Sequence, residues 1–229
     1  MKSNVKIDEV NNVEAIDKKI TVVKMFWIFF IACFLGTVIE MIFCFIIENR
    51  IMTRAGVIYG PFNPVYGFGA LLITILLHNF RDKKKLYIFL ITMVVGAGFE
   101  YICSLFQELA FGTITWEYSN TFLNLQGRTN FAYSVFWGTL GVFWIKTAYP
   151  ILDKFIENIM NLPKKIGVIL TVMLFIFMSY NCFISIAASR RQYERRQGIG
   201  PSNSFEIYLD NKYTDEYLKK VFPMSRLVE

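Results

Sequence analysis

The chain has 229 residues, of which 55% are hydrophobic and 18% are charged, and its mean hydropathy is +0.42. This composition excludes an ordinary water-soluble enzyme domain and is typical of an integral membrane protein. The net charge of +6 does not indicate nucleic acid as a partner, because the basic residues flank separate apolar runs and form no single patch.

Residues 1–22 are polar and mixed in charge, and we expect a surface arm there. About 20 polar residues before the first apolar run argue against a cleavable signal peptide. Five apolar runs follow, each near the length of about 20 residues that crosses a hydrocarbon core: Val23–Ile47, Pro64–Phe80, Leu86–Phe111, Asn130–Pro150 and Ile166–Ala188. We predict an all-α polytopic membrane protein with about five transmembrane helices, four of them in a core over residues 23–150.

The first and third runs align without a gap at an offset of 60 residues. The offset matches identical residues at five positions: Ile31 with Ile91, Gly36 with Gly96, Glu40 with Glu100, Ile42 with Ile102, and Glu48 with Glu108. This match predicts that the first four helices form two tandem hairpin repeats. Both copies would cross the membrane in the same direction, related by a pseudo-two-fold axis along the membrane normal.

Glu40 and Glu100 lie inside membrane-length apolar runs. A charge near the bilayer centre costs about 3 kcal/mol on insertion scales, so such residues usually line a pathway or a polar site. Gly36 and Gly96 lie one turn before them on the same helix face and predict close helix packing. If the repeat holds, the two faces meet and the carboxyl groups form one substrate or ion site. The alternative is that each glutamate is protonated and only bonds a neighbouring helix.

Two irregular segments precede the second and fourth runs and carry the other candidate site residues. In the first segment glycine and proline break the helix, and polar side chains are available to line a pathway: Tyr59, Gly60, Pro61, Asn63, Pro64, Tyr66, Gly67 and Gly69. Interfacial anchoring is the alternative role for its tyrosines. The second segment contributes Trp116, Glu117, Tyr118, Asn124, Gly127 and Arg128. Arg128 is expected to pair with Glu117 or with an anionic group, and Asn124 to correspond to Asn63.

Apolar residues recur at helical spacing between the fourth and fifth runs, which predicts an interfacial amphipathic helix over residues 151–163. A fifth transmembrane helix over 164–189 and a polar basic tail over 190–229 follow. In the tail, Thr214 is a suitable cap for a short helix with Asp215 and Glu216 in its first turn. We expect the tail to be solvated, and a docking role for it is the alternative.

Basic residues predict the orientation of the chain, because they accumulate on the cytoplasmic side. Eleven of them flank one side of the predicted spans: Lys18, Lys19, Lys24, Arg81, Lys83, Lys84, Lys85, Lys146, Lys154, Lys164 and Lys165. The N-terminus is therefore expected in the cytoplasm of a multi-pass plasma-membrane protein. Arg50, Arg54 and Arg128 would lie on the other side, and four arginines after the fifth run conflict with this orientation: Arg190, Arg191, Arg195 and Arg196.

No phosphate loop, zinc-protease motif or nucleophile elbow occurs in the chain, and its four cysteines have no metal-ligand spacing. We therefore expect no enzymatic activity, cofactor or metal.

The loop Tyr59-Gly60-Pro61-x-x-Pro64-x-Tyr66-Gly67-x-Gly69 resembles that of a bacterial family of type IV ABC-transporter membrane proteins, the CmpB type. Glu100, the Trp116-x-Tyr118-Ser119 and Asn124-x-x-Gly127-Arg128 segment, and Trp137-Gly138 resemble the same family over residues 25–145. Glu117 stands where the family usually has aspartate. The resemblance implies a permease-like subunit that takes its energy from a separate ATP-binding subunit.

Three functions stay open. The first is a permease or permease-like subunit, embedded in membrane lipid, with the glutamates in a polar site and a homodimer as a plausible assembly. The second is a non-catalytic scaffold or sensor that acts through its basic tail. The third is a membrane enzyme acting on lipid, with Glu117, Asn124 and Arg128 at the headgroup level.

Overall fold

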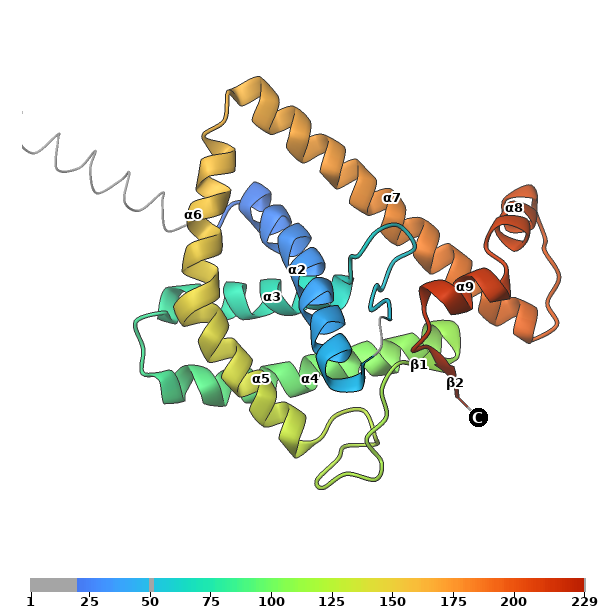
Figure 1. Cartoon of the computed structure of the whole chain (residues 1–229), viewed down its shortest axis with the longest axis horizontal. Coiled ribbons are helices and arrows are strands. Elements are labelled where there is room, and N and C mark those ends of the chain that lie inside the picture. The colour runs from blue at the N-terminus through green and yellow to red at the C-terminus, as the bar shows by residue number, and fades with distance from the viewer. Residues whose placement is uncertain (1–19, 50–51, 229) are drawn as a thin grey trace, which may run out of the picture.

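The computed structural model describes residues 20–49 and 52–228, apart from the side chains of residues 47 and 48 (Figure 1). Most of the predicted N-terminal arm, Arg50 and the Glu48 side chain therefore lie outside the described residues. The described chain is nearly all helical, as expected.

The helices follow one another in the order α2 (Val22–Glu48), α3 (Pro64–Leu77), α4 (Lys85–Phe111), α5 (Phe131–Phe143), α6 (Tyr149–Met160), α7 (Lys164–Arg196), α8 (Ser204–Lys212) and α9 (Asp215–Val221). A 3₁₀ turn, His78–Phe80, ends α3, and a π-helical segment, Trp144–Ala148, joins α5 to α6. Two short strands, β1 (Thr113–Ile114) and β2 (Arg226–Leu227), pair antiparallel.

Four described helical segments are long and apolar enough to cross a membrane: Val22–Ile46, Lys85–Phe111, Phe131–Met160 and Lys164–Arg196. The second of the five predicted spans coincides with α3 and its 3₁₀ turn, which are shorter. The 14 residues of α3 rise about 21 Å, against a hydrocarbon core of about 30 Å. Four long helices and one short one thus occupy the predicted positions, and the count of five full spans is not confirmed.

The short length of α3 follows from an irregular segment that reaches the middle of α2. The Asn63 amide donates to the Cys33 carbonyl at 3.1 Å, near the midpoint of α2, and Asn63 caps α3 by accepting from the Val65 amide. Pro64 occupies the first turn of α3, where its missing N–H costs nothing. At Gly60 the backbone has φ +79°, which favours glycine.

Backbone polar groups of this irregular segment are satisfied by α7. The Ile58 amide donates to the Ser185 hydroxyl at 2.8 Å, and the Tyr59 amide and carbonyl both bond the Asn181 side chain. Asn181 and Ser185 are buried. Irregular backbone at the level of membrane helices requires such cover, so α7 supplies the partners that a continuous helix would have provided internally.

Small residues bring α2 against α3 and α4 against α5. A Cβ atom at Gly36 would overlap the Tyr66 ring, and one at Gly96 would overlap the Trp137 side chain. Close packing at small residues is how helices associate in lipid, and Gly36 and Gly96 both lie at such close contacts. Whether the two pairs are symmetric repeats stays a prediction.

α5, the π-helical segment and α6 run on as one rod in Figure 1. The predicted amphipathic helix over 151–163 therefore lies largely in α6 and continues α5 directly. Its buried residues Leu152 and Ile156 pack against Trp27 and Ile28 of α2. Lys24 of α2 forms an ion pair with Asp153 at 2.6 Å, which fixes this end of the rod beside the start of α2.

α7 extends to Arg196, so the expected boundary between span and tail at 189 falls inside a helix. The tail is folded and docked, and the expectation of a solvated tail was wrong. Leu209, Tyr213 and Leu218 form a buried core with Ile58 and with Ile184 and Ala188 of α7. Tyr213 also shares a hydrogen bond of 2.7 Å with Tyr59, and β2 joins the tail to β1.

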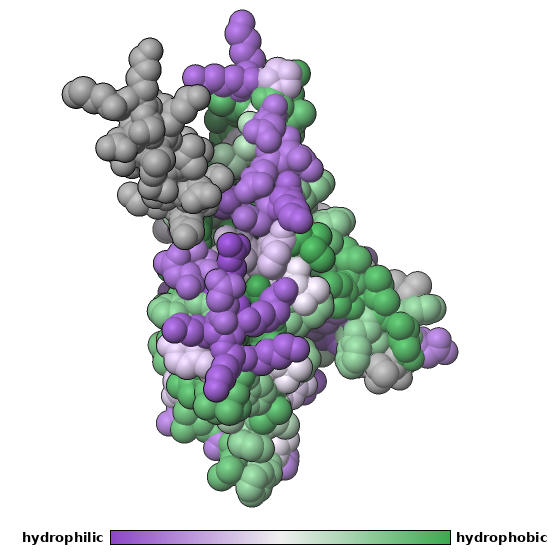
Figure 2. All heavy atoms as spheres, turned by 90° about the vertical axis from the view of Figure 1, so that its left-hand side faces the viewer, coloured by the Kyte–Doolittle hydropathy of each residue, from purple (hydrophilic) through white to green (hydrophobic). Residues whose placement is uncertain are grey.

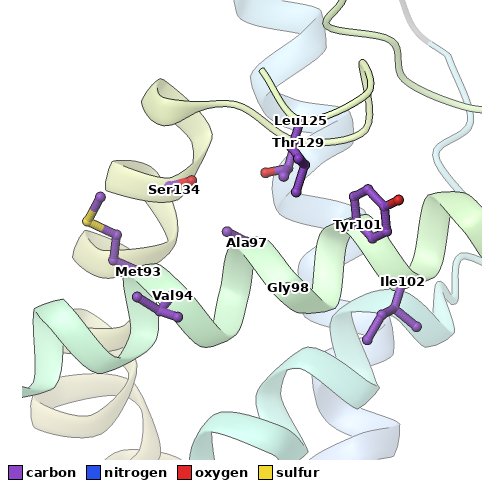
Figure 3. A pocket seen from close by; sticks show the side chains of 9 residues that line it. All are labelled: Met93, Val94, Ala97, Gly98, Tyr101, Ile102, Leu125, Thr129 and Ser134. Carbon is purple, nitrogen blue, oxygen red and sulfur yellow. The ribbon is translucent and has the colours of Figure 1, made fainter. Parts of the chain in front are cut away.

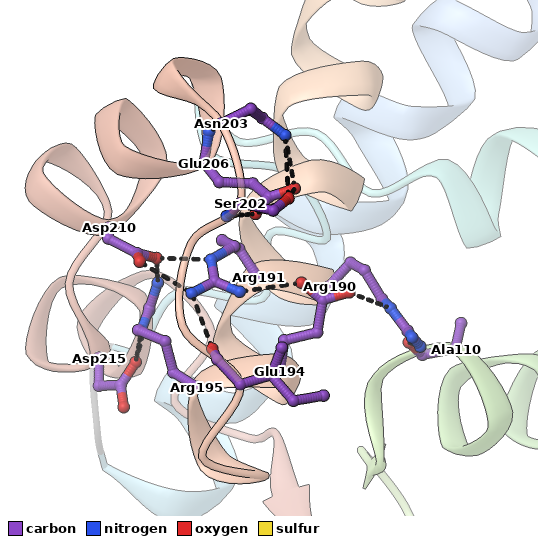
Figure 4. A network of polar contacts seen from close by, with 11 residues as sticks. Ala110, Arg190, Arg191, Glu194, Arg195, Ser202, Asn203, Glu206, Asp210 and Asp215 are labelled. Atoms are coloured by element: carbon purple, nitrogen blue, oxygen red, sulfur yellow. Dashed lines mark hydrogen bonds and ion pairs between the residues drawn. The ribbon is translucent and has the colours of Figure 1, made fainter.

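Ion pairs hold the tail at the end of α7, as Figure 4 shows. The Arg191 guanidinium, whose side chain is 2% exposed, donates two hydrogen bonds to Asp210 and one to Glu194. Arg195 bonds Asp210 at 2.6 Å and Asp215 at 2.5 Å. Two of the arginines that conflicted with the predicted orientation, Arg191 and Arg195, thus have a structural role at this end.

Hydrophilic residues gather in one band when the molecule is viewed from the end that carries α6 and the turn between α3 and α4 (Figure 2). Hydrophobic surface borders this band on both sides. The turn itself is exposed and includes Arg81, Lys83 and Lys84. Lys146 of the π-helical segment donates to the carbonyls of Arg81 and Lys83.

Candidate functional site

The first polar cluster, defined here as Glu40, Cys44, Arg54 and Tyr66, joins α2 to the irregular segment and to α3. The Tyr66 hydroxyl donates to Oε2 of Glu40. Nη1 of Arg54 lies 3.6 Å from Oε1 of Glu40, and Nη2 of Arg54 is 2.9 Å from Sγ of Cys44. The Glu40 side chain keeps 31% of its surface exposed, whereas Arg54 keeps 11%. An ion pair with one accessible carboxylate therefore lies between the two helices.

Asn63 fixes the backbone that carries Arg54. Its Nδ2 donates to the Arg54 carbonyl at 3.1 Å while its Oδ1 caps α3. Gly56 lies directly against the Asn63 side chain and leaves no room for a Cβ atom. Asn63 is thus a positioning residue for the first cluster.

The second polar cluster, defined here as Glu100, Ser104, Glu108, Tyr118, Arg128 and Thr129, joins α4 to the segment before α5. The Thr129 hydroxyl donates to Oε2 of Glu100 at 2.7 Å, and the Tyr118 hydroxyl donates to Oε1 at 3.2 Å. Arg128 pairs with Glu108 at 2.6 Å and donates to the Ser104 hydroxyl at 3.3 Å. Glu100 is 8% exposed, so this carboxyl group is more enclosed than Glu40.

The segment of residues 115–130 is held by its own hydrogen bonds. The Trp116 indole donates to the Arg128 carbonyl, and the Asn124 side chain bonds the Gly127 amide and the Ser119 carbonyl. Gly127 has φ +67°, and a Cβ atom there would overlap Glu117 and Ser119. The sequence-predicted residues of this segment thus form one compact loop above α4.

Glu117 and Arg128 do not form the expected ion pair among the contacts of the described residues. Arg128 bonds Glu108 on α4, whereas Glu117 accepts from the Ser119 amide at 2.7 Å. Hydrogen bonds from the Ser119 hydroxyl and amide hold the pKa of Glu117 below its usual value. The expectation failed because the Arg128 side chain bonds Glu108 and Ser104 of α4.

The two glutamates are held separately. Within residues 20–49 and 52–228, no hydrogen bond or ion pair joins Glu40 to Glu100, and each takes its partners from its own cluster. A single site built from both carboxyl groups is therefore not present in these contacts. Tyr59 also lies apart from the clusters, bonded to Tyr213 of the tail.

Sequence reasoning did not find Arg54, Thr129 and Glu108 as site residues. The signal for Arg54 was a basic residue just after an apolar run, but such residues usually mark only the membrane surface. Asn124 was matched to Asn63, yet the residue that caps α5 as Asn63 caps α3 is Asn130. Side chains that reach back from an irregular loop have no fixed spacing from their partners, so periodicity could not reveal them.

Among the described residues, no group of three or more histidine, cysteine, aspartate and glutamate side chains is arranged to hold a metal ion. The chemistry available in both clusters is ion pairing and hydrogen bonding by hydroxyl, carboxyl and guanidinium groups.

Comparison with known proteins bears on the family of this chain. No curated protein and no solved structure matches it. Residues 27–186, more than half of the chain, match the family described as "Putative ABC-transporter type IV", which confirms the resemblance carried by the motifs of the two loops. With long apolar helices and this match, the protein is a membrane protein and belongs to that ABC-transporter family.

Proposed function

We propose that the chain is a permease-like membrane subunit of an ABC transporter, and that its two polar clusters line the substrate pathway. Both clusters lie within the residues that match the family, and the docked tail lies outside them. The family match supports a transporter component but names no substrate. Energy then comes from a separate ATP-binding subunit, since the chain itself has no motif for ATP hydrolysis.

The observation that carries this proposal is the common plan of the clusters. In each, a glutamate inside a long apolar helix accepts a hydroxyl bond, and an arginine from the following loop bonds the residue one turn further on, Cys44 or Ser104. A single buried glutamate could serve only as a link between helices. Two matching clusters, each with an arginine in a membrane region where charge is costly, favour a functional role.

A substrate pathway must be enclosed by protein, and a single copy of this chain encloses little. In the most apolar stretch of each of the four long helices, at most 28% is buried within the protein. We therefore propose a homodimer, in which a second copy completes the enclosure around the clusters. Its presence is measured by the mass of the purified protein in detergent micelles.

The first test is gentle purification of the tagged protein from its native cell, with mass spectrometry of the co-eluting proteins. A near-stoichiometric ATP-binding protein is the expected result. If none co-elutes at any mild detergent condition, the transporter-subunit proposal fails and a stand-alone membrane protein remains.

The second test changes the carboxyl groups in the purified complex. Glu40→Gln and Glu100→Gln are expected to leave membrane insertion and subunit assembly intact and to abolish the stimulation of ATPase activity by an extract of native cells. Glu157→Gln is the control, because Glu157 lies in α6 with half of its side chain exposed. Full stimulation in the Glu40→Gln, Glu100→Gln double variant would overturn the role of the clusters.

A scaffold or sensor that acts through the tail is the second candidate. It is favoured by the contact of the tail with both loop regions, through Tyr213 and Tyr59 and through β2 and β1. Removal of residues 198–229 leaves α7 whole and tests it directly. Loss of function in this truncated protein, with both glutamate variants active, would favour the scaffold.

A further inference from the structure

An apolar groove runs along α4 outside the two clusters (Figure 3). Its volume is about 450 Å³, within the range of small-molecule sites. Ala97 and Gly98 of α4 lie along it, and Leu125, Thr129 and Ser134 approach from the loop and from the start of α5. Met93, Val94, Tyr101 and Ile102 complete its lining.

Gly98 keeps this groove open. A Cβ atom at Gly98 would meet no atom within 4 Å, whereas a Cβ atom at Gly96, two residues earlier, would overlap Trp137. The absence of a side chain at Gly96 is thus explained by helix packing against α5. Helix packing does not explain the absence of a side chain at Gly98, where that absence only leaves space in the groove.

The surroundings of the groove indicate what fills it. Val94, Ile102 and Leu125 at its edges are 72%, 64% and 57% exposed, and α4 is long and apolar enough to cross a membrane. The groove is therefore continuous with the surface that faces hydrocarbon. Water would find few partners there, because an apolar space offers no hydrogen bonds. A helix of a second copy, about 10 Å across with its side chains, is bulkier than a hydrocarbon chain. The hydrocarbon chain is therefore the occupant that this groove favours.

We propose that this groove is a binding site for one acyl chain of a bilayer lipid. The polar end of such a lipid would lie near Tyr101, whose hydroxyl donates to Gln126 and whose ring is 5.8 Å from the Arg128 guanidinium. Thr129 lines the groove and also bonds Glu100. A bound chain therefore lies one side chain away from the second cluster, whether or not that cluster transports anything.

The experiment uses the full chain in phosphatidylcholine vesicles that contain a small fraction of phosphatidylcholine with a photoreactive diazirine in one acyl chain. After illumination and digestion, mass spectrometry locates the lipid adducts. We expect adducts on peptides of residues 93–102 and 125–134 in excess of those on the exposed face of α7, which reports ordinary contact with surrounding lipid.

Variants at Gly98 separate a specific site from general exposure. Gly98→Leu should reduce groove labelling by about tenfold, the change expected from displacing roughly two methylene groups, and Gly98→Ala should reduce it less. Gly167→Ala in α7 is the matched control, because its added Cβ comes no closer than 3.5 Å to another residue. Labelling of α7 should be unchanged in all three variants.

Two outcomes would overturn the proposal. One is groove labelling that is no greater than α7 labelling in the unaltered protein. The other is undiminished groove labelling in a folded Gly98→Leu variant. Since no transport is measured, neither outcome depends on the proposed permease function, and loss of transport activity would leave the lipid site unaffected.

Discussion

Glycines two residues apart on α4 have opposite surroundings. The Gly96 position faces the Cβ and Cγ atoms of Trp137, and the Gly98 position faces open space. Because the added atom is the same methyl group, a pair of alanine variants separates the effect of helix packing from that of helix propensity.

We expect Gly96→Ala to lower the unfolding temperature and Gly98→Ala to leave it unchanged or raised. Overpacking of a close contact costs about 1–3 kcal/mol, whereas alanine without a clash favours a helix over glycine. Thermal unfolding of both variants in one detergent, followed by size-exclusion chromatography, measures the difference. Equal unfolding temperatures would contradict the α4–α5 contact at Gly96.

The sequence identified Glu40 and Glu100, and it also named Tyr66, Tyr118 and Arg128, but it did not show which of these groups bond one another. Glu40 and Glu100 were visible because a carboxyl group in a long apolar run is rare. Arg54 and Thr129 were not visible, since an irregular loop has no period from which contacts can be derived. Glu108 was seen only as one member of the repeat, and its pairing with Arg128 required the loop conformation.

At the scale of elements, apolar length located the helices well, and local capping rules located one short helix. α9 begins after Thr214, whose side chain accepts from the Tyr217 amide, as predicted. The docking of α8 and α9 on α7 was only the less favoured alternative. It depends on Leu209 and Tyr213 meeting residues far away in the sequence, such as Ile58, and no local pattern reports such contacts.

Asp210 is the centre of this docking. Burial by itself would raise its pKa, but hydrogen bonds from Arg191 and Arg195 outweigh burial and hold the pKa below the usual value. A carboxyl group with a lowered pKa stabilises the folded state above its unfolded pKa of about 3.9 and loses this contribution as the pH falls through the folded value. The attachment of the tail should therefore not change with pH above about 4 and should weaken below it.

We expect Asp210→Asn to release α8 and α9 at neutral pH. It leaves the buried Arg191 guanidinium with Glu194 as its remaining carboxylate, and breaking a buried ion pair costs about 3–5 kcal/mol. Hydrogen exchange of residues 204–221 is the measurement. Asp215→Asn is the control, since Asp215 is 48% exposed and pairs with the less buried Arg195, and exposed pairs contribute little. Equal protection in both variants would exclude Asp210 as the anchor.

At the scale of the whole molecule, the path of the chain sets which side each end occupies. α2 starts beside α6, and the turn between α3 and α4 is bonded to Lys146 at the same end. α7 starts there too, because Trp27 of α2 bonds Thr171. The tail docks at the far end of α7. There it contacts the irregular segment before α3 through Tyr59 and Tyr213, and it contacts β1, which follows α4. Although α3 is short, the chain changes ends at each successive helix from α2 to α7 when α5 and α6 are counted as one rod.

This path, with exposed basic residues at the end that carries Arg81, Lys83 and Lys84, favours a cytoplasmic position for that end. The tail then lies on the outer side. The arginines of the tail region do not oppose this assignment as strongly as their number suggested, because Arg191 and Arg195 are needed there to bind Asp210.

We therefore expect Gly200→Cys to react with a membrane-impermeant maleimide in intact cells and Lys83→Cys to react only after the membrane is opened. Gly200 is exposed and an added Cβ atom meets nothing within 4 Å, so the substitution should not disturb the tail. The four native cysteines lie in helices α2, α4 and α7, and the unaltered protein measures their background. Labelling of Lys83→Cys in intact cells, with Gly200→Cys protected, would indicate the opposite orientation. Both polar clusters would then lie nearer the cytoplasmic side.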